Sequence, residues 1–322
     1  MKIGVLGGGQ LGRMLALAGI PMGLEFRFLE ERPEAVRGLG ECCTDLEEFA
    51  RELDAVTFEF ENVPLESVRW LEQRLPVWPS SRALEVSCDR LAEKEFLRSL
   101  SIPTAPYGPD IAYPALAKKR RLGYDGKGQR RIARPDELKE DELAEEILAF
   151  ERELALLAVR SKAGEIRTYP LTETVHRDGI LVKASAPAEG PFCEYARLIL
   201  EKLDYVGVLA LEMFEHQGRL LANELAPRVH NSGHWTIEGA LTSQFENHLR
   251  AGLGWPLGDT KARDQVVMYN LIGELPGPER FPGAHYHAYG KAPRPGRKVG
   301  HVTLLGGGIL PELEVACARS AP

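Results

Sequence analysis

Two apolar runs flank a short polar turn in the middle of the chain, and this pattern restricts the local fold more than any other. The first run covers residues 206–214 and the second covers 220–226, with Gly218 at the centre of the turn. Apolar runs separated by a few residues that include glycine predict an antiparallel hairpin. A three-residue loop over 217–219 would pair the two strands symmetrically about Gly218.

This register sets two acidic side chains opposite each other. Glu212 then faces Glu224 on one side of the hairpin. Opposed side chains have Cβ atoms about 5 Å apart, where like charges destabilise a sheet, so the pair needs a shared proton or a cation. Asn223 offers a further oxygen, and Mg²⁺ is commonly held by carboxylates together with substrate phosphates. We predict a Mg²⁺ site here; the alternative is a solvated acidic hairpin with another loop length.

The composition is that of an ordinary globular protein and argues against several classes. The chain has 322 residues, 44% of them hydrophobic and 27% charged, which allows two or three domains. A net charge of −7 argues against a nucleic-acid binder, and no apolar run approaches the roughly 18 residues of a membrane span. Five cysteines without C-x-x-C spacing favour free thiols in a reducing compartment. We expect a cytoplasmic protein without nucleic-acid or membrane partners.

A strand, a glycine-rich loop and a helix open the chain over residues 2–20. This order predicts the beginning of a doubly wound α/β domain, in which glycines let backbone amides approach an anion at the helix N-terminus. Gly7, Gly9 and Gly12, followed by Glu30, also fit a dinucleotide-binding fingerprint. NAD binding therefore remains an open alternative at this stage.

Periodicity and turn signals predict the remaining elements. We expect helices over 45–53, 66–74, 88–100 and 235–251, and a helix or a helix that leads into a hinge over 142–150. We expect strands over 55–60, 77–78, 153–160, 166–171, 265–273 and 285–289.

Two basic segments with glycines are candidate anion sites. Residues 118–129 (KKRRLGYDGKGQ) begin with four cations and continue into a loop with three glycines. This combination is typical of a loop that covers phosphates, although it is not a Walker A motif. Residues 291–301 gather four Lys or Arg residues and His301 in an acidic protein, as an anionic substrate would require. An exposed basic turn is the alternative for the first segment. His285 and His287 could suit zinc, but no third ligand is evident.

Longer motifs follow one another in a fixed order from residue 3 to about 304. They are GGGQLGRM at 7–14, TFEFENVP at 57–64, CDRLAEKEFL at 88–97, GYDGKGQ at 123–129, FERELALLAVRS at 150–161, LALEMF at 209–214, NELAPRVHNSGHWTIEGA at 223–240, TSQFENHLRA at 242–251 and PRPGRKVGH at 293–301. Together they resemble the N5-carboxyaminoimidazole ribonucleotide synthetases, the ATPase subunits of bacterial phosphoribosylaminoimidazole carboxylase, in the ATP-grasp superfamily. NELAPRVHNSGHW is highly specific for this family, whereas GGGQLGRM alone is not.

The resemblance implies an ATP-grasp fold of mixed α/β and α+β class in three units. These are an N-terminal doubly wound parallel-sheet domain over 1–103, a small lid domain over 104–160, and a larger antiparallel-sheet domain over 161–322 that carries the metal hairpin and the basic loop. Leu122 stands where the family usually has glycine, and the segments 36–46 and 107–117 are shorter than usual. We interpret these departures as trimmed loops.

The resemblance also implies a reaction. Family members carboxylate 5-aminoimidazole ribonucleotide with bicarbonate and ATP, through carboxyphosphate, in de novo purine biosynthesis. Mg²⁺ would accompany ATP, and a homodimer with functional coupling to the N5-carboxyaminoimidazole ribonucleotide mutase is expected. The nearest alternative is another ATP-grasp ligase, such as a formate-dependent glycinamide ribonucleotide transformylase. An NAD-dependent oxidoreductase is the more distant alternative.

The family's functional residues map onto this sequence position by position. Glu212 and Glu224 would hold Mg²⁺. The implied catalytic residues are Arg228, His230, Tyr124 and Asp125. The implied ATP-binding residues are Arg90, Lys118, Gly123, Tyr124, Asp125, Gly126, Lys127, Gly128, Gln129, Glu145, Glu146, Ile147, Leu148, Glu153, His176, Asn223 and Glu224. The implied ribonucleotide-binding residues are Gln10, Leu11, Glu59, Lys291, Arg297 and Lys298.

Overall fold

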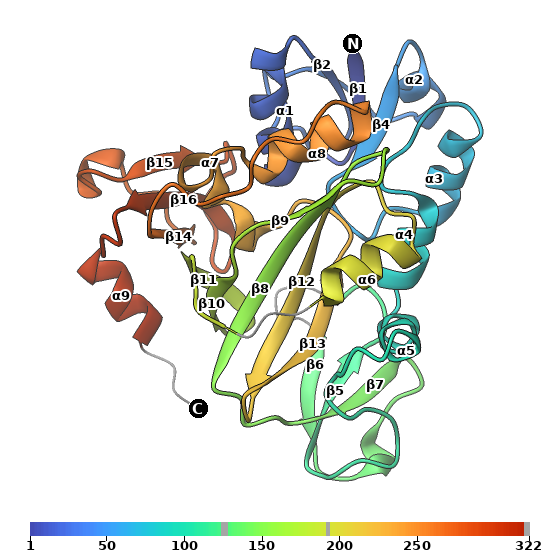
Figure 1. Ribbon diagram of the computed structural model, residues 1–322, viewed down its shortest axis with the longest axis vertical. Helices are drawn as coiled ribbons and strands as arrows, with labels where there is room; N and C mark the ends of the chain where they lie inside the picture. The colour runs from blue at the N-terminus through green and yellow to red at the C-terminus, as the bar shows by residue number, and fades with distance from the viewer. Residues whose placement is uncertain (124–127, 191–193, 319–322) are drawn as a thin grey trace.

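The computed structural model describes residues 1–123, 128–190 and 194–318, which form three β-sheets with flanking helices. In Figure 1 the N-terminal unit lies at the top, a small sheet lies at the bottom, and long strands of a large sheet run between them. Within the described residues, no helix combines the length and the apolar character needed to cross a membrane.

The N-terminal unit is a parallel sheet with the strand order β3-β2-β1-β4. Different helices cover its two faces: Ile3 and Val5 pack in the same apolar cluster as helix α1, whereas Leu6 packs with helices α2 and α3. The predicted doubly wound arrangement is therefore confirmed. The strands are β1 (Lys2–Leu6), β2 (Glu25–Leu29), β3 (Glu41–Cys43) and β4 (Ala55–Phe58).

Side-chain caps set the beginnings of two N-terminal helices. The carboxylate of Asp45 accepts a hydrogen bond from the Glu48 amide at 2.8 Å, and Asp89 accepts one from Leu91 at 3.0 Å. The predicted strand over 77–78 is a single bridge from Val77 to β4. The helices are α1 (Gln10–Gly19), η1 (Ile20–Met22), α2 (Leu46–Ala50), α3 (Leu65–Glu72), α4 (Ser81–Ser87) and α5 (Arg90–Ser99).

The small sheet is antiparallel, with β5 (Ala115–Lys119) between β6 (Gln129–Ile132) and β7 (Glu142–Glu146), and a 3₁₀ turn η2 (Pro135–Glu137) joins its last two strands. The predicted helix over 142–150 is wrong. Its residues favour a helix, but β7 pairs along the whole of β5, and this pairing overrides the local preference.

The large sheet has nine strands, in the order β13-β12-β8-β10-β11-β14-β16-β15, with β9 paired to β8. Strand β8 belongs to this sheet, although the sequence-based division counted its residues with the small unit. The strands are β8 (Arg152–Arg160), β9 (Ile166–Thr168), β10 (Thr172–Arg177), β11 (Ile180–Ala186), β12 (Gly207–His216), β13 (Arg219–Ala226), β14 (Val266–Ile272), β15 (His285–Ala288) and β16 (Lys298–Leu305).

The predicted continuous helix over 235–251 is interrupted. The chain leaves helical geometry at Ala240, which forms a bridge with Ala262, and helix begins again where the Ser243 side chain accepts from the Glu246 amide at 3.1 Å. The helical elements are α6 (Tyr195–Lys202), η3 (Asn231–Gly233), α7 (Thr236–Gly239), α8 (Gln244–Leu253), η4 (Pro278–Arg280) and α9 (Pro311–Ala318).

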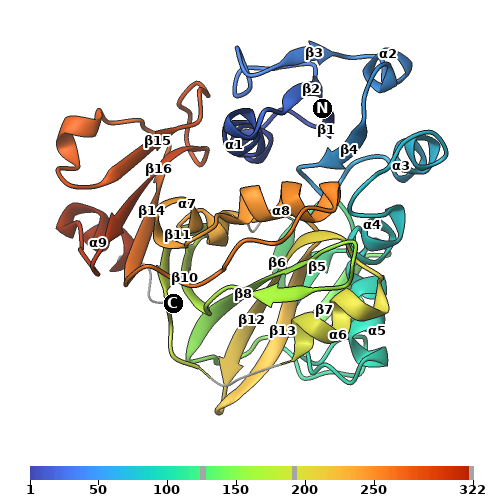
Figure 2. The same cartoon turned by 45° about the horizontal axis from the view of Figure 1, so that its top comes forward.

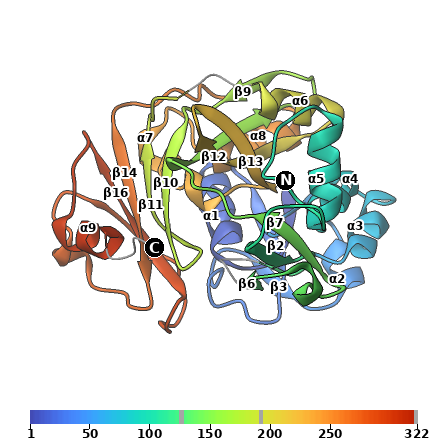
Figure 3. The ribbon, with the colours of Figure 1, turned by 90° about the horizontal axis from the view of Figure 1, so that it is seen from below.

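Helix α8 joins the N-terminal unit to the large sheet. Figure 2 shows α8 between α1 and the long strands, and one buried cluster contains residues of β1, α1, α8 and β12. Seen from below, β14, β16 and α9 lie at one end of the molecule, and α2 and α3 lie at the other (Figure 3). The shared core holds the two units in a defined relation, and the cleft described next lies between them and the small sheet.

Candidate active site

A cleft of about 900 Å³ lies where the three sheets meet. Its walls come from the glycine loop after β1, the segment after β4, strands β5 and β6, and strands β8, β10, β12 and β13. Most of the predicted site residues line it, so the structure brings together groups that are far apart in the sequence. These are Gln10, Leu11, Glu59, Arg90, Lys118, Gly128, Gln129, Glu153, His176, Glu212, Asn223, Glu224, Arg228, His230, Lys291 and Lys298.

Other predicted residues lie elsewhere. Gly123 lines a smaller pocket next to Arg90 and Glu224. Five residues fall outside the lining of the main cleft, although Glu145 contacts it through Lys118: Glu145, Glu146, Ile147, Leu148 and Arg297. Four residues lie outside the described part of the chain: Tyr124, Asp125, Gly126 and Lys127.

The hairpin of β12 and β13 sets Glu212 opposite Glu224, as predicted. The loop length differs from the prediction, because the turn has two residues and not three. Gln217 and Gly218 both have positive φ, at 51° and 70°, as in the turn type that suits two-residue hairpins. A bulge in the strand pairing then shifts the register and restores the opposition of the two carboxylates.

The two carboxylates occupy different surroundings. Burial raises the pKa of Glu212; the Glu224 charge also raises it, while His176 opposes the shift. The Oε2 of Glu224 lies 3.1 Å from Nη2 of Arg90. The Oε1 of Glu212 lies 3.6 Å from Nε2 of His230. Two opposed acids in one cleft are the ligand type that suits a hard divalent cation.

A buried charge cluster lies behind the cleft at the small sheet. Glu145 Oε2 on β7 is 3.0 Å from Lys118 Nζ on β5 and 3.3 Å from Lys94 Nζ on α5. Burial opposes the ionisation of Glu145, but the two ammonium groups outweigh it and lower its pKa to about 2. Burial also lowers the pKa of Lys118, and the nearby cations add to this effect, although Glu145 opposes it. The cluster fixes the direction of Lys118, whose side chain lines the cleft.

Glu153 on β8 and His176 on β10 form an ion pair on the floor of the cleft. Burial favours the neutral imidazole, but Glu153 and Glu212 outweigh it and raise the pKa of His176. This pair offers both a hydrogen-bond donor and an acceptor to a bound polar group.

Arg228 and His230 follow β13 and carry the polar chemistry of the opposite wall. The Ser232 amide donates to Nδ1 of His230 at 3.3 Å, so the imidazole proton lies on Nε2, toward Glu212. Burial and the Arg228 charge hold the pKa of His230 well below its usual range. His230 is therefore a neutral donor beside a permanently charged guanidinium, an arrangement suited to a small oxyanion.

The glycine loop is already filled by side chains of the protein. Glu59 accepts hydrogen bonds from the Gly9 amide and, at 2.7 Å, from the Gly12 amide. Glu30 accepts one from the Gly8 amide at 3.1 Å. These are the amides that would bind a dinucleotide pyrophosphate, so the loop does not offer the site that NAD binding requires.

The fold separates His285 from His287, the two histidines considered as zinc ligands. His287 joins Glu238 and His301, whose ligand atoms lie within 4.8 Å of one another, and His285 is exposed. The rings of His287 and His301 stack with centroids 4.3 Å apart and planes 11° apart. An ion bound by an imidazole lies close to the ring plane, and two stacked parallel rings cannot share one ion in this way. The cluster is therefore packing behind the cleft.

Glu61, just after β4, lines the cleft and pairs with Arg228. Its position at the C-terminal end of the predicted strand over 55–60 marks it, with Glu59, as a candidate ligand group, and an exposed strand end was the alternative. Other lining residues were not predicted. Apolar residues on the cleft side of the strands could not be told from core residues in the sequence, because burial and ligand contact select the same side chains. These include Leu116, Leu154, Leu181, Met213 and Phe214.

Comparisons with known proteins agree with this arrangement. Family models match three segments: a ribonucleotide synthetase preATP-grasp domain over 1–88, an ATP-grasp domain over 104–245, and a phosphoribosylaminoimidazole carboxylase C-terminal domain over 266–309. The N5-carboxyaminoimidazole ribonucleotide synthase of Pseudomonas aeruginosa is 46% identical over 339 residues, which covers 94% of each chain. The chain belongs to the N5-carboxyaminoimidazole ribonucleotide synthase family.

Solved structures place the fold in the same family. The N5-carboxyaminoimidazole ribonucleotide synthetase of Thermus thermophilus is 48% identical, with a TM-score of 0.90 over 99% of both chains. The Aspergillus clavatus N5-carboxyaminoimidazole synthase, solved with ADP and 5-aminoimidazole ribonucleotide, is 30% identical, with a TM-score of 0.84 over 98% of this chain and 96% of that one. The predicted family, ATP-grasp fold and class of ATP-dependent ligase are confirmed.

Proposed function

We propose that the enzyme carboxylates 5-aminoimidazole ribonucleotide with bicarbonate and ATP, and that the residues of the cleft carry out this reaction. The observation that carries the proposal is the meeting of three kinds of group in one cleft. The opposed carboxylates, the half-buried pair Arg228 and His230, and the lysines at the ribonucleotide end all line this cleft. Bicarbonate is a poor electrophile, so phosphorylation by ATP to carboxyphosphate precedes the transfer of carbon dioxide to the amine.

Glu212 and Glu224 would hold Mg²⁺ with the nucleotide. The fit is good because both ligands are carboxylates facing one another, and burial together with the Glu224 charge raises the pKa of Glu212, which a cation would reverse. When bound, the ion neutralises charge on the phosphates. Around it, Lys118 and Arg90 would contact phosphate oxygens, and Asn223 lies beside them.

The nucleotide would occupy the part of the cleft between the small and large sheets. Glu153 and His176 would bind its ribose side, and the segment from Glu145 to Leu148, which connects the two sheets, would lie at the adenine. The 123–129 loop would cover the phosphates. Phosphoryl transfer depends on positioning and charge neutralisation more than on covalent help, which agrees with a cleft lined by cations and carboxylates.

Arg228 and His230 would bind bicarbonate and the carboxyphosphate formed from it. The guanidinium supplies a permanent positive charge. The neutral imidazole donates a hydrogen bond from Nε2 and does not compete for the proton of the substrate. A lid that closes over the cleft would exclude water from an intermediate that hydrolyses readily. Tyr124 and Asp125 complete the proposed catalytic set.

The ribonucleotide would bind at the end of the cleft formed by the N-terminal unit and the loop between β15 and β16. Lys291 contacts Gln10 across this junction, and Lys298 also lines the cleft. Together with Leu11, Glu59 and Arg297 these residues would surround the ribose phosphate and the imidazole. The loop thus brings positive charge to the substrate phosphate.

We further propose a cytoplasmic homodimer that is functionally coupled to the mutase acting on its product. The family resemblance supports the dimer and the coupling. Within the described residues, Cys42, Cys43 and Cys88 are free thiols, in agreement with a reducing compartment.

ADP release tests the proposed reaction. ATP, Mg²⁺ and bicarbonate are supplied with and without 5-aminoimidazole ribonucleotide, and with glycinamide ribonucleotide and formate in a parallel reaction. Strong stimulation by the aminoimidazole substrate, with bicarbonate required, supports the proposal. ADP release that ignores this substrate, or that responds to formate, contradicts it and favours another ATP-grasp ligase.

A further inference from the structure

A bulge in β13 creates the opposition of the two acidic residues. The two-residue turn pairs His216 with Arg219, and that register alone would set Glu212 opposite Asn223. The register shifts between Glu212 and Met213, so that Glu212 pairs with Glu224 while Met213 pairs with Ala222. Asn223 is the extra residue, and without this bulge the two carboxylates would not face each other.

The edge of β13 that faces away from β12 shows the same irregularity. β13 is an edge strand, and in a regular strand every second residue turns its amide to the same edge. Here the Ala222 amide donates to the Pro103 carbonyl at 2.7 Å, and the Leu225 amide donates to Glu93 Oε1 at 2.9 Å. These two amides are three residues apart, whereas a regular strand would place them an even number of residues apart. A neighbouring strand with regular pairing could therefore not bind both amides, and the bulge needs other hydrogen-bond partners.

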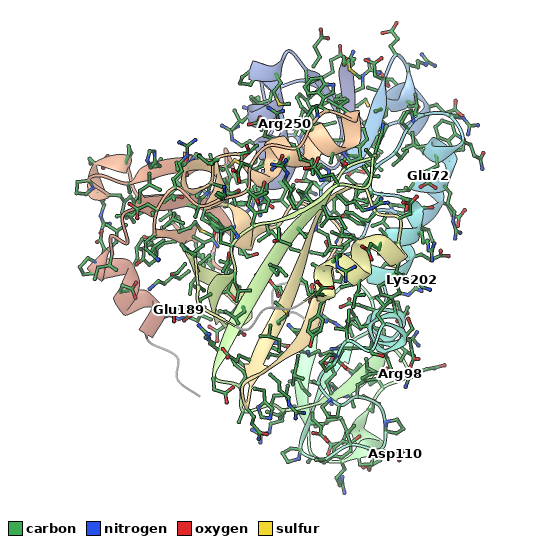
Figure 4. All side chains as sticks on the ribbon, viewed as in Figure 1. Glu72, Arg98, Asp110, Glu189, Lys202 and Arg250 are labelled. Carbon is green, nitrogen blue, oxygen red and sulfur yellow. The ribbon has the colours of Figure 1, made fainter. Side chains whose placement is uncertain are left out.

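Helix α5 supplies the partner of the Leu225 amide and two further contacts to the bulge, whereas Pro103 lies on the segment that follows the helix. Its Lys94 Nζ donates to the Asn223 carbonyl at 3.2 Å, and Arg90, one turn earlier, pairs with Glu224. Glu93 and Lys94 are only 2% and 1% exposed. Arg98 lies on the outer side of the helix, with its side chain 68% exposed (Figure 4). The buried ionisable side chains of α5 are thus gathered at the bulge.

We propose that Glu93 and Lys94 are positioning residues, which hold the bulge in β13 and thereby keep Glu224 opposite Glu212 as a cation ligand. The inference rests on the proposed function, in which this pair binds Mg²⁺. Neither side chain needs to touch the cation or a substrate. Glu93 holds the amide that follows Glu224, and Lys94 holds the carbonyl that precedes it.

The cost of burying these two ionisable groups supports a specific role. A buried ionisable group is unfavourable unless it is hydrogen-bonded or paired, and an apolar side chain of similar size would fill the same space. Lys94 also lies 3.3 Å from Glu145, which contacts Lys118. The same residue therefore connects the metal hairpin to the small sheet, whose Lys118 faces the nucleotide end of the cleft.

Direct cation binding tests this role without relying on turnover. Mn²⁺ affinity is measured by electron paramagnetic resonance on the full-length protein with saturating ADP, for the wild type, Glu93→Gln, Glu93→Leu and Lys94→Met. Gln retains an oxygen acceptor for the Leu225 amide, so its Kd stays within about threefold of the wild type. Leu and Met remove the partners of the bulge, and each weakens Mn²⁺ binding at least about tenfold.

Two further variants show whether weaker Mn²⁺ binding comes from lost stability, from a wrong metal assignment or from lost positioning. Asn247→Leu removes another buried side chain that accepts from a backbone amide, that of Gly258 at 2.8 Å, and it should lower the Tm without changing the Mn²⁺ Kd. Glu224→Gln removes a proposed ligand. If wild type and Glu224→Gln bind Mn²⁺ equally, the metal hairpin itself is wrong. If Glu224→Gln binds weakly while folded Glu93→Leu and Lys94→Met bind normally, only the positioning role is overturned. If Glu93→Leu does not fold, Lys94→Met decides.

Discussion

Glu61 accepts a hydrogen bond from Nε of Arg228 at 2.5 Å, across the junction between the N-terminal unit and the large sheet. Burial opposes the ionisation of Glu61, but the Arg228 charge and hydrogen bond keep its pKa below the usual range. Nη1 of Arg228 donates to the Val229 carbonyl at 3.2 Å. The guanidinium that we assign to bicarbonate is therefore oriented by a carboxylate from another part of the fold.

Replacing Glu61 with Gln should weaken the use of bicarbonate selectively. A hydrogen bond to a charged group is worth roughly 1.5–3 kcal/mol, so kcat/KM for bicarbonate should fall about tenfold or more, while KM for ATP stays within about twofold. Steady-state ADP release with varied bicarbonate measures both constants. The control is Glu66→Gln, which breaks an exposed ion pair with Arg69 and should change neither. A loss confined to ATP affinity would refute the assignment of Arg228.

Glu224→Gln should abolish Mg²⁺-dependent turnover without unfolding the protein. The change removes one of two opposed carboxylates but also the charged partner of Arg90. The loss of repulsion and the loss of the ion pair oppose each other, so the Tm should change little. The loss of charge stabilisation should reduce kcat by about 10²-fold or more. Differential scanning fluorimetry and ADP release test the two parts. Normal turnover would eliminate the metal hairpin, and a large fall in Tm would show a structural role instead.

Gly9→Ala should disturb the ribonucleotide end of the cleft. A Cβ at this position would lie 2.6 Å from Oε1 of Glu59, so the carboxylate must move away from the loop amides. KM for the ribonucleotide should rise about tenfold, equivalent to about 1.4 kcal/mol, with ADP binding unchanged. Gly23→Ala is the control, because its φ is +79° but nothing lies within 4 Å. Equal effects of both variants on KM would mean that general strain is the cause.

Local patterns predicted the parts of the fold that depend on nearest neighbours. The strand, glycine loop and helix at the N-terminus needed only apolar periodicity and glycine. The opposition of Glu212 and Glu224 was predicted from a hairpin with a three-residue loop, and it holds because the bulge compensates for the two-residue turn. The helix predicted over 142–150 failed because pairing with β5 decides its conformation. The break in the helix at Ala240 was not predicted, because it depends on a bridge with the distant residue Ala262. Ser243 and Glu246 nevertheless carry a capping signal in the sequence.

Site residues could be predicted from the sequence where the residue type itself indicates a chemical role. They could not be predicted where the role depends on the three-dimensional surroundings. Arg228 and His230 stand out as polar residues in a short segment, and the family motifs assign them. Glu93 and Lys94 resemble ordinary charges on an amphipathic helix, and only the structure shows that they are buried against a bulge. The bulge itself was hidden, because a three-residue turn without a bulge and a two-residue turn with one give the same opposition of residues 212 and 224.

His248 gives a prediction about stability and pH. Its Nδ1 accepts from the Val208 amide at 3.0 Å, so its Nε2 carries the proton and donates to Thr57 Oγ1 at 2.8 Å. The ring thus joins β12 of the large sheet to β4 of the N-terminal unit. Burial lowers the pKa of His248 to about 3, whereas the unfolded chain binds this proton near pH 6.5.

The unfolded state therefore binds more protons between pH 6.5 and pH 3, and His248 makes the free energy of unfolding fall as pH decreases through that window. In His248→Gln this contribution is absent, so the slope should become smaller by up to about 1.4 kcal/mol per pH unit. Urea unfolding at pH 7.5, 6 and 5 measures the slope in both proteins. The variant should be less stable than the wild type at pH 7.5, and the difference should shrink toward pH 5. A difference that stays constant with pH would mean that His248 does not remain neutral in the folded protein.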